Sequence, residues 1–487
     1  MSSTQFVRSE RRVEPIGFGT KISQGVGIVP GALKELAFQS FLLLYYNQVL
    51  GLPAFYASVA LGIALVVDAV SDPLVGSFSD NFRHRLGRRH PLMFAALLPF
   101  TLCLYALFSP PALADLSLFF WLVCFSVGTR FLFTFYAIPW NALFAEMSDN
   151  YNERSELLAW RFAVGWIFGI GFTFTIYTVA FAATDEYPQG QLNPDSYQTF
   201  AALLAITVLL TGFLTTWLTL DQVRYLPQPQ AEHRRFSLVA VRQELMAAFG
   251  NQDFRILFFA VLASGVIGGT NQAMQLYVNT YFWGLTGEAL RWMAFSFFGG
   301  LLAFLTVLPV QRRFDKKYLL VTCALAIIVL TAVPVTLRLL GVAPLNGTNE
   351  LLVILVGNTV VLSYFGTIGL IMFASMVADT VDVQEYHTGL RQEGVFNSAI
   401  TFSGKVTTAG GILIAGLLID FVVGLPEAAG KEEVTDEMVL KIGVLDAYIV
   451  PAFNIVWLYL ATRYGVTRER FQEIRRALDA KADRVSN

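Results

Sequence analysis

Charged residues are scarce in this 487-residue chain. Asp, Glu, Lys and Arg together make up 14% of it, whereas hydrophobic residues make up 55% and the mean hydropathy is +0.56. A soluble protein with one core cannot bury that much apolar surface, so the composition indicates a polytopic membrane protein. The net charge is only −2, so no basic excess points to nucleic acid as a partner.

Cysteine and histidine are also rare. The three cysteines, Cys103, Cys124 and Cys323, fall in separate apolar runs, which argues against disulfides and against a metal cluster. The four histidines have no metal-ligand spacing, and no glycine-rich phosphate loop or nucleophile triad is recognisable. We therefore expect neither enzymatic activity nor an organic cofactor. The polar N-terminal residues do not form a cleavable signal peptide.

What the chain does contain is about twelve apolar runs, each of roughly the 20 residues that span a bilayer as a helix. They lie at about 32–52, 54–79, 91–110, 117–145, 157–183, 198–220, 253–283, 289–310, 318–340, 350–378, 395–424 and 442–462. The pattern predicts an all-α membrane protein with about twelve transmembrane helices.

Basic residues alternate between the connections. The connections 83–89 and 312–317 and the tail beyond 464 are rich in Lys and Arg, whereas 111–116, 184–197 and 341–349 contain none. Because cytoplasmic loops carry the excess of Lys and Arg, both termini are expected in the cytoplasm, in a plasma (bacterial inner) membrane. Setting this topology is one role for Arg83, Arg85 and Arg88; a role in gating is the alternative.

The order of runs and loops repeats once. Six runs, a polar connection and six more runs divide the chain, and the two basic loops follow the second run of each half. The expected parts are a cytoplasmic segment 1–30, a six-helix half 31–220, a cytoplasmic connection 221–252, a second six-helix half 253–464 and a cytoplasmic tail 465–487. Two facing halves of six helices resemble the plan of the major facilitator transporters, whose substrate sites lie near the midplane.

Two carboxylates, Asp68 and Asp72, interrupt the apolar run between about 55 and 78. A spacing of four residues puts them on one face of a helix. A single charge in the bilayer costs about 2.5–3.5 kcal/mol on insertion scales, so each must be protonated, paired or bound to a cation. We predict an oxygen site for a small hard ion, Na⁺, Li⁺ or H⁺, with the Ser71 hydroxyl and a carbonyl freed by Pro73 as further ligands.

Lys405 is the expected partner of this site. It lies in an apolar run among small residues, which allow helices to approach closely. An ammonium beside the two carboxylates would leave net negative charge for one monovalent ion and would leave when the ion arrives. The alternative is a static ion pair that only joins two helices.

The stretch Asp68–Gly76 and the loop that follows it resemble the second helix and loop of the glycoside–pentoside–hexuronide:cation symporters. The stretches Ile138–Leu143, Ala378–Asp382 and Arg391–Gly411 are similar to the fourth helix, the end of the tenth and the eleventh helix of that family. The resemblance implies a major facilitator fold, a cation site at Asp68 and Asp72, and Lys405 close to it. We also assign Asp379 and Asp382 to gating.

By the same resemblance, the protein is expected to couple Na⁺ or H⁺ to uptake of a sugar, glycoside or uronide by alternating access. Arg161 resembles a fifth-helix arginine that lines the substrate cavity. Further substrate-binding residues are expected near the motif positions: Tyr136, Trp140, Asn141 and Trp160. We expect a monomer whose partners are a small-molecule substrate and membrane lipid.

The substrate remains open at this point, because the two acidic residues that hold sugar in sugar-transporting members are Ala32 and Ala137 here. A lysolipid or another non-sugar substrate is one alternative, and an uncoupled facilitator or exporter is another. A remote alternative is a polytopic prenyltransferase, whose helical carboxylates hold Mg²⁺, but the spacing to Asp80 does not fit that enzyme.

Overall fold

A computed structural model describes residues 7–8, 15–148, 150–228, 249–388, 393–428 and 433–486. Within these residues, twelve helical segments are long and apolar enough to cross a membrane, which confirms the predicted all-α membrane fold. The segments are Phe18–Val49, Ala54–Asn81, His90–Leu107, Asp115–Met147, Glu153–Ala180, Pro194–Leu218, Gln252–Phe282, Gly287–Arg313, Lys316–Leu339, Asn349–Tyr386, Phe402–Val423 and Asp436–Thr462.

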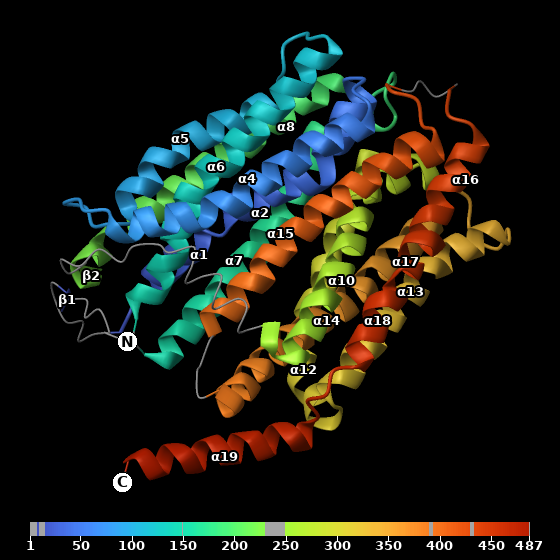
Figure 1. The fold of residues 1–487 in the computed structure, drawn as a ribbon. Helices are drawn as coiled ribbons and strands as arrows, with labels where there is room; N and C mark the ends of the chain where they lie inside the picture. The colour runs from blue at the N-terminus through green and yellow to red at the C-terminus, as the bar shows by residue number, and fades with distance from the viewer. Residues whose placement is uncertain are drawn as a thin grey trace. The chain divides into compact units, whose positions relative to one another are not determined.

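The chain forms two compact units. Of the described residues, the first unit holds those within 1–236, 286–294 and 416–434, and the second holds those within 237–285, 295–415 and 435–487. The helices of the first unit include α1 (Phe18–Val26), α2 (Val29–Leu36), α4 (Ala54–Asn81), α5 (His90–Leu107), α6 (Asp115–Met147), α7 (Tyr151–Thr175) and α8 (Pro194–Leu218). Within this unit α6 packs against both α4 and α5, α1 packs against α7, and α5 packs against α8. Figure 1 shows these helices from blue to green.

The first span starts earlier than the sequence predicted. The helix begins at Phe18, inside the segment 1–30 that we expected to lie outside the membrane, and a turn at Gly27 and Ile28 separates α1 from α2. Polar residues such as Lys21 and Gln24 lower the hydropathy of this first part. Gln24 is nevertheless fully buried, because its side chain bonds to another buried polar group described below. Pro30 then lies in the first turn of α2, where the missing N–H is not needed.

The N-terminus of α4 is held by a carboxylate from far along the chain. Both oxygens of Asp420, in the π-helical segment η8 (Leu418–Val423), accept backbone N–H bonds, from Ala54 at 3.1 Å and from Phe55 at 2.7 Å. Gln48 also donates to the carbonyl of Pro426 at 3.0 Å. An acceptor at the start of a helix satisfies N–H groups that have no partner within it. This explains why Asp420 stands in an otherwise apolar run.

The second unit is built around α14 (Asn349–Thr388), which packs against α12 (Ser296–Arg313) and α13 (Lys316–Leu339). The remaining helices include α10 (Gln252–Tyr277), most of α15 (Glu393–Leu417), α16 (Asp436–Val444), α17 (Val450–Ala452) and α18 (Asn454–Thr462). The last helix, α19 (Arg468–Ser486), runs across the end of α14 rather than along it (Figure 1).

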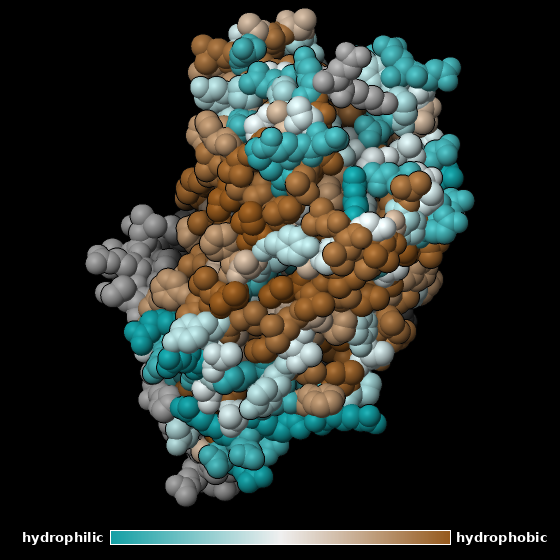
Figure 2. Space-filling model, turned by 90° about the vertical axis from the view of Figure 1, so that its right-hand side faces the viewer, coloured by the Kyte–Doolittle hydropathy of each residue, from teal (hydrophilic) through white to brown (hydrophobic). Residues whose placement is uncertain are grey.

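Many large apolar side chains point outward. Leu305 on α12, for example, is 70% exposed. On the face shown in Figure 2, apolar side chains form a broad band and hydrophilic ones gather toward its two ends. Such a band matches the hydrocarbon region of a bilayer, and the chain is an integral multi-pass membrane protein.

Two very short strands join the N-terminus to the connection between the halves. β1 (Val7–Arg8) pairs antiparallel with β2 (Pro227–Gln228). Most of the expected connection 221–252 lies outside the described residues, which resume at residue 249.

Candidate functional site

The carboxylates of Asp68 and Asp72 meet at one hydroxyl. Both side chains lie on the face of α4 that packs against α6, as the spacing of four residues predicted. The Thr134 Oγ1 on α6 lies 3.2 Å from an oxygen of Asp68 and 3.2 Å from an oxygen of Asp72. Asp68 is 4% exposed, so this convergence of oxygens is inside the unit.

A fixed positive charge adjoins the same carboxylates. Arg130 lies one helical turn before Thr134 and is 1% exposed. Its Nη1 is 3.4 Å from Asp68 Oδ2 and 3.7 Å from Glu35 Oε1, and its guanidinium lies over the Phe38 ring at 4.4 Å. Because arginine does not lose its proton in proteins, Arg130 carries a full charge in this site.

Two charges on α2 complete the group. Lys34 is buried, pairs with Glu35 at 2.7 Å and lies over the Phe133 ring at 4.3 Å. We call Lys34, Glu35, Asp68, Asp72, Arg130 and Thr134 the acid cluster. It holds three carboxyl groups and two cationic side chains, so the carboxylates outnumber the cations by one when all are ionised.

Two other residues, Ser71 and Lys405, were predicted for the ion site. The Ser71 hydroxyl donates to the backbone carbonyl of Asp68 at 3.1 Å, so its hydrogen bond returns to its own helix. Lys405 lies on α15, in the part of that helix that belongs to the second unit, and is half-buried. Its coupling role stays a prediction. Among the described residues, no group of three or more His, Cys, Asp or Glu side chains is arranged to hold a metal ion.

Arg161 on α7 forms a second buried site with neutral partners. Its Nε donates to Gln24 Oε1 at 3.1 Å, Nη1 to Asn141 Oδ1 at 3.3 Å and Nη2 to the Trp140 carbonyl at 3.4 Å. The guanidinium also lies over the rings of Trp140, at 3.7 Å, and Phe144, at 4.5 Å. In the described part of the chain, no carboxylate forms an ion pair with Arg161, which is 8% exposed. We call Gln24, Trp140, Asn141 and Arg161 the arginine site.

The first span supports this site through its backbone. The Trp140 indole donates to the carbonyl of Gln24 at 3.0 Å, and the Tyr136 hydroxyl donates to that of Gly27 at 3.3 Å. A Cβ on Gly27 would lie 2.0 Å from the indole nitrogen, so only glycine fits there. Trp160, also predicted to bind substrate, packs edge-on against Phe18 with ring centroids 5.1 Å apart. Its role in substrate binding stays a prediction.

The basic loop after α4 divides into two kinds of arginine. Arg83 and Arg85 are exposed, and no ion pair of theirs occurs within the described ranges. Arg88 is buried and pairs with Glu146 at the end of α6, 2.6 Å away. The adjacent Arg89 reaches the same oxygen at 2.6 Å and Asp80 at 2.7 Å. Burial lowers the pKa of Arg88, and the Glu146 carboxylate opposes that shift.

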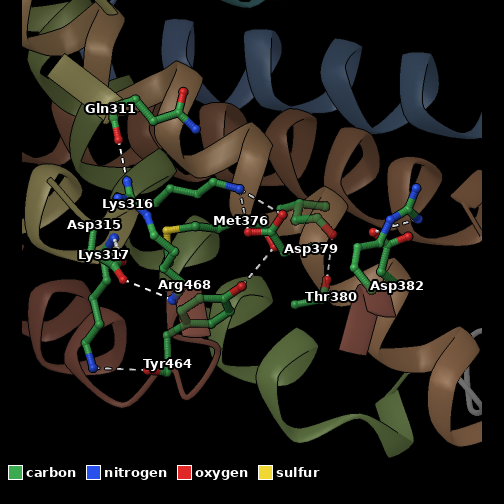
Figure 3. Close-up of polar contacts among 12 residues, drawn as sticks. Gln311, Asp315, Lys316, Lys317, Met376, Asp379, Thr380, Asp382, Tyr464 and Arg468 are labelled. Atoms are coloured by element: carbon green, nitrogen blue, oxygen red, sulfur yellow. Dashed lines mark hydrogen bonds and ion pairs between the residues drawn. The ribbon is translucent and has the colours of Figure 1, made fainter. Parts of the chain in front are cut away.

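The second unit carries a corresponding ion pair. Lys316, at the start of α13, bonds both carboxylate oxygens of Asp379 on α14, at 2.6 and 2.8 Å. The phenol of Tyr464 donates to the carbonyl of Met376 at 3.2 Å, and burial raises the pKa of that phenol well above its usual range. Figure 3 shows these contacts. Lys316, Asp379 and Arg468 also line a cavity of about 510 Å³.

Asp382, the other α14 residue assigned to gating, has a looser partner. Its carboxylate lies 3.5 Å from Arg475 Nη1 on α19, and the side chain of Arg475 is half-exposed. A contact of that length at the surface contributes little. The gating roles of Asp379 and Asp382 stay predictions.

Several members of these sites were missed by sequence reasoning. Thr134 was not singled out because a lone threonine in an apolar run is common, although it lies four residues after an intramembrane arginine. Gln24 fell outside the predicted first span. Glu146 was overlooked because it lies at the end of a run and its partners are 57 and 58 residues away.

Comparison with known proteins agrees with this architecture. The model of the family described as MFS/sugar transport protein matches residues 23–468. The chain is 26% identical to a putative sulfoquinovose importer of Salmonella typhimurium, over 85% of this chain and 83% of the relative. It is 23% identical to the putative glycoside/cation symporter YagG of Escherichia coli, over 94% of each chain.

Solved structures share the fold. A D-xylose–proton symporter superposes with a TM-score of 0.55 and 13% identity, over 92% of this chain and 95% of that one. The resemblance to glycoside–cation symporters is confirmed, and the chain belongs to the MFS/sugar transport protein family of the major facilitator superfamily.

Proposed function

We propose that this protein is a cation-coupled secondary symporter that imports a sugar or sugar derivative by alternating access. The observation that carries the proposal is the acid cluster, in which Asp68, Asp72 and Thr134 bring three oxygens together inside a membrane-spanning bundle. Intramembrane carboxylates of this kind mark ion pathways. Both termini lie in the cytoplasm in this proposal, and the membrane is the plasma membrane.

The geometry of α6 supports coupling between ion and substrate. Thr134 of the acid cluster and Asn141 of the arginine site are seven residues apart on one helix, which places them on one face about 10 Å apart along the axis. A displacement of α6 that follows ion binding therefore reaches the arginine site directly. Coupling of this type is typically worth about 1–3 kcal/mol, and substrate tightens ion binding by the same factor.

The arginine site supports an acidic sugar as the substrate. A buried guanidinium whose hydrogen bonds all go to neutral groups is a costly arrangement unless an anion joins it. A carboxylate or sulfonate accepts two parallel N–H bonds from arginine, which a neutral hydroxyl cannot match. The relative named as a putative sulfoquinovose importer, whose named substrate is an acidic sugar, agrees with this assignment.

Transport by purified protein in proteoliposomes tests the proposal. Neutral glycosides, uronides and sulfonated sugars are offered with an imposed H⁺ or Na⁺ gradient. We expect concentrative uptake of an acidic sugar under one gradient and its loss in Asp72→Asn. Unchanged concentrative uptake by Asp72→Asn would contradict the coupling role, and uptake that no gradient accelerates would indicate a facilitator.

A further inference from the structure

A cavity of the second unit lies where α12 ends and α19 begins. It has a volume of about 510 Å³, and its lining includes Arg312 on α12, Lys316 on α13 and Arg468 on α19. We propose that this cavity binds the phosphate of an anionic membrane phospholipid, whose acyl chains lie along α12. The proposal concerns a site apart from the acid cluster and the arginine site, and it does not depend on which substrate or ion is transported.

The outer face of α12 leads from the apolar surface to this cavity. Leu301, Leu305 and Leu308 are all exposed, and Arg312, which is also exposed, follows Leu308 by four residues. Spacings of three and four residues place these side chains in one row along a helix. On a membrane-spanning helix, a row of exposed leucines faces the acyl chains of the bilayer. The row therefore ends on a guanidinium at the end of the span, where lipid headgroups begin.

The basic residues of the cavity outnumber its acidic residues. Three basic residues, Arg312, Lys316 and Arg468, line it together with two acidic ones, Asp315 and Asp379. Both oxygens of Asp379 already accept bonds from Lys316, at 2.6 and 2.8 Å (Figure 3). The oxygens of Asp315 accept backbone N–H groups at the starts of α13 and α19, at 3.1 and 3.2 Å. An anion that enters the cavity therefore meets one positive charge in excess.

Two of the three basic side chains have no carboxylate partner among the residues that the structure describes. The guanidinium of Arg468 donates to three carbonyls at the end of α12, those of Gln311, Arg312 and Phe314, at 2.5–3.2 Å. The side chain of Arg312 forms no hydrogen bond and no ion pair within the described ranges. Because arginine binds phosphate oxygens through two parallel N–H bonds, a phosphate fits the unused donors of Arg312.

The position of the cavity favours a lipid as the source of this phosphate. In the proposed topology this end of α12 faces the cytoplasm, and the cytoplasmic surface of a membrane carries anionic lipids that basic residues attract. Leu308, Val466 and Phe471 supply apolar side chains to the same lining. Contact with these side chains would not stabilise a soluble phosphate ion. A phospholipid can contact both kinds of lining, since its headgroup is charged and its glycerol ester and acyl chains are apolar.

The melting temperature of the full-length protein in a neutral detergent tests the proposal. It is measured with added phosphatidylglycerol, phosphatidylcholine, glycerol 3-phosphate or inorganic phosphate, at equal ionic strength. We expect phosphatidylglycerol to raise the melting temperature by a few degrees more than the other three compounds, because a ligand that binds only the folded state stabilises it. An equal rise with inorganic phosphate or glycerol 3-phosphate would overturn the lipid as the source. An equal rise with phosphatidylcholine would overturn the requirement for an anionic headgroup.

Two adjacent arginines separate a specific site from general attraction to a charged surface. Arg312→Gln is expected to lower the phosphatidylglycerol-dependent rise to about half or less. Arg313→Gln is the matched control, because it removes the same charge from the next residue of α12 but Arg313 does not line the cavity. The rise should be unchanged in Arg313→Gln. An equal loss in both variants would reduce the effect to surface charge and overturn the site, and so would a full rise in Arg312→Gln. None of these measurements involves transport, so their failure would leave the proposed symport function standing.

Discussion

The arginine site illustrates how a single buried side chain limits the choice of substrate. All the hydrogen-bond acceptors around Arg161 are uncharged, and the aromatic rings of Trp140 and Phe144 hold the guanidinium in place. In addition, the Gln24 Nε2 is buried and has no partner within the described residues. Buried polar groups are normally satisfied, so donors left over at one place indicate an acceptor-rich ligand.

Arg161→Gln is expected to weaken binding of an acidic sugar about 10–100-fold, because a hydrogen bond to a charged group is worth about 1.5–3 kcal/mol. The affinity of Arg161→Lys for the acidic sugar should lie between those of the wild-type protein and Arg161→Gln, since an ammonium keeps the charge but loses the planar pair of donors. Uptake KM values measure the effect, and the neutral analogue of the same sugar serves as the control. An equal loss for acidic and neutral sugars would show that Arg161 only supports the fold.

Glu146 provides a residue-scale test of the loop after α4. Glu146→Gln leaves Arg88 and Arg89 buried without their shared carboxylate, which should destabilise the protein by about 3–5 kcal/mol. Asp80→Asn is the matched control, because it removes a carboxylate from the same Arg89. Asp80 is 61% exposed, so this substitution should lower the stability by only about 0–1 kcal/mol. Thermal or denaturant unfolding measures the loss of stability in Glu146→Gln and in Asp80→Asn. Similar losses in the two variants would contradict the importance of burial.

Among the individual site residues, the sequence identifies those whose chemistry is conspicuous in a membrane. Asp68, Asp72 and Arg161 stand out because a charge in an apolar run needs an explanation. Thr134, Gln24 and Tyr136 could not be assigned their contacts from sequence, because each reaches a partner on another helix. The direction of a neutral polar side chain depends on which face the neighbouring helix covers.

Among the elements, the first span shows most clearly what local sequence cannot predict. Hydropathy places its start at about residue 32, but the structure continues the helix back to Phe18, because Ser23 and Gln24 are buried against α7 and α8 rather than exposed to water. The Ser23 carbonyl accepts from Thr215 at 2.8 Å, and Gln24 accepts from Arg161. Hydrogen bonds to neighbouring helices thus satisfy polar groups that would be costly to place in a membrane on an isolated helix.

The approach of α1 to α6 gives a prediction for the element scale. Gly27→Ala should displace the Trp140 ring, because the added Cβ would lie 2.0 Å from its indole nitrogen, and the stacking on Arg161 would be lost with it. We expect a lower melting temperature and a higher KM. Gly19→Ala is the control, since a Cβ there meets nothing within 4 Å. A Gly27→Ala protein with wild-type affinity would show that Trp140 is not needed at its position.

The contact between Asp420 and α4 gives a second prediction at the scale of elements. Asp420→Ala removes both acceptors from the N-terminus of α4 and should cost about 1 kcal/mol, as loss of a helix cap usually does. Unfolding measurements on Asp420→Ala and Asp420→Asn separate hydrogen bonding from charge. Stability unchanged in both variants would contradict the capping role.

Across the whole molecule, the internal repeat extends from the pattern of spans to specific ion pairs. In each half a basic residue near the loop after the second span pairs with an acid on the fourth span: Arg88 with Glu146, and Lys316 with Asp379. The sequence predicts the two loops, the number of spans and the family. It does not predict which residues pair, because Asp379 lies 63 residues from Lys316 and contacts it only through helix packing.

Lys405 belongs to this scale, because it lies in the second unit while the carboxylates it is expected to serve lie in the first. We predict that Lys405→Gln abolishes ion-driven accumulation but retains exchange of substrate across the membrane, because the ion no longer displaces a competing charge. Counterflow and gradient-driven uptake in the same vesicles measure the two activities. Full accumulation by Lys405→Gln would show that the ammonium has no part in coupling.

One feature of α6 constrains how this chain can vary. Arg130, Thr134, Trp140, Asn141 and Glu146 all project from one helix, and together they serve three separate sets of partners. Adding or deleting one residue between Arg130 and Glu146 turns everything beyond it by about 100° around the axis. Point changes here affect one set of contacts at a time, whereas such a shift in register would misdirect at least two of them together. The interval from Arg130 to Glu146 should therefore vary less in length than in residue type.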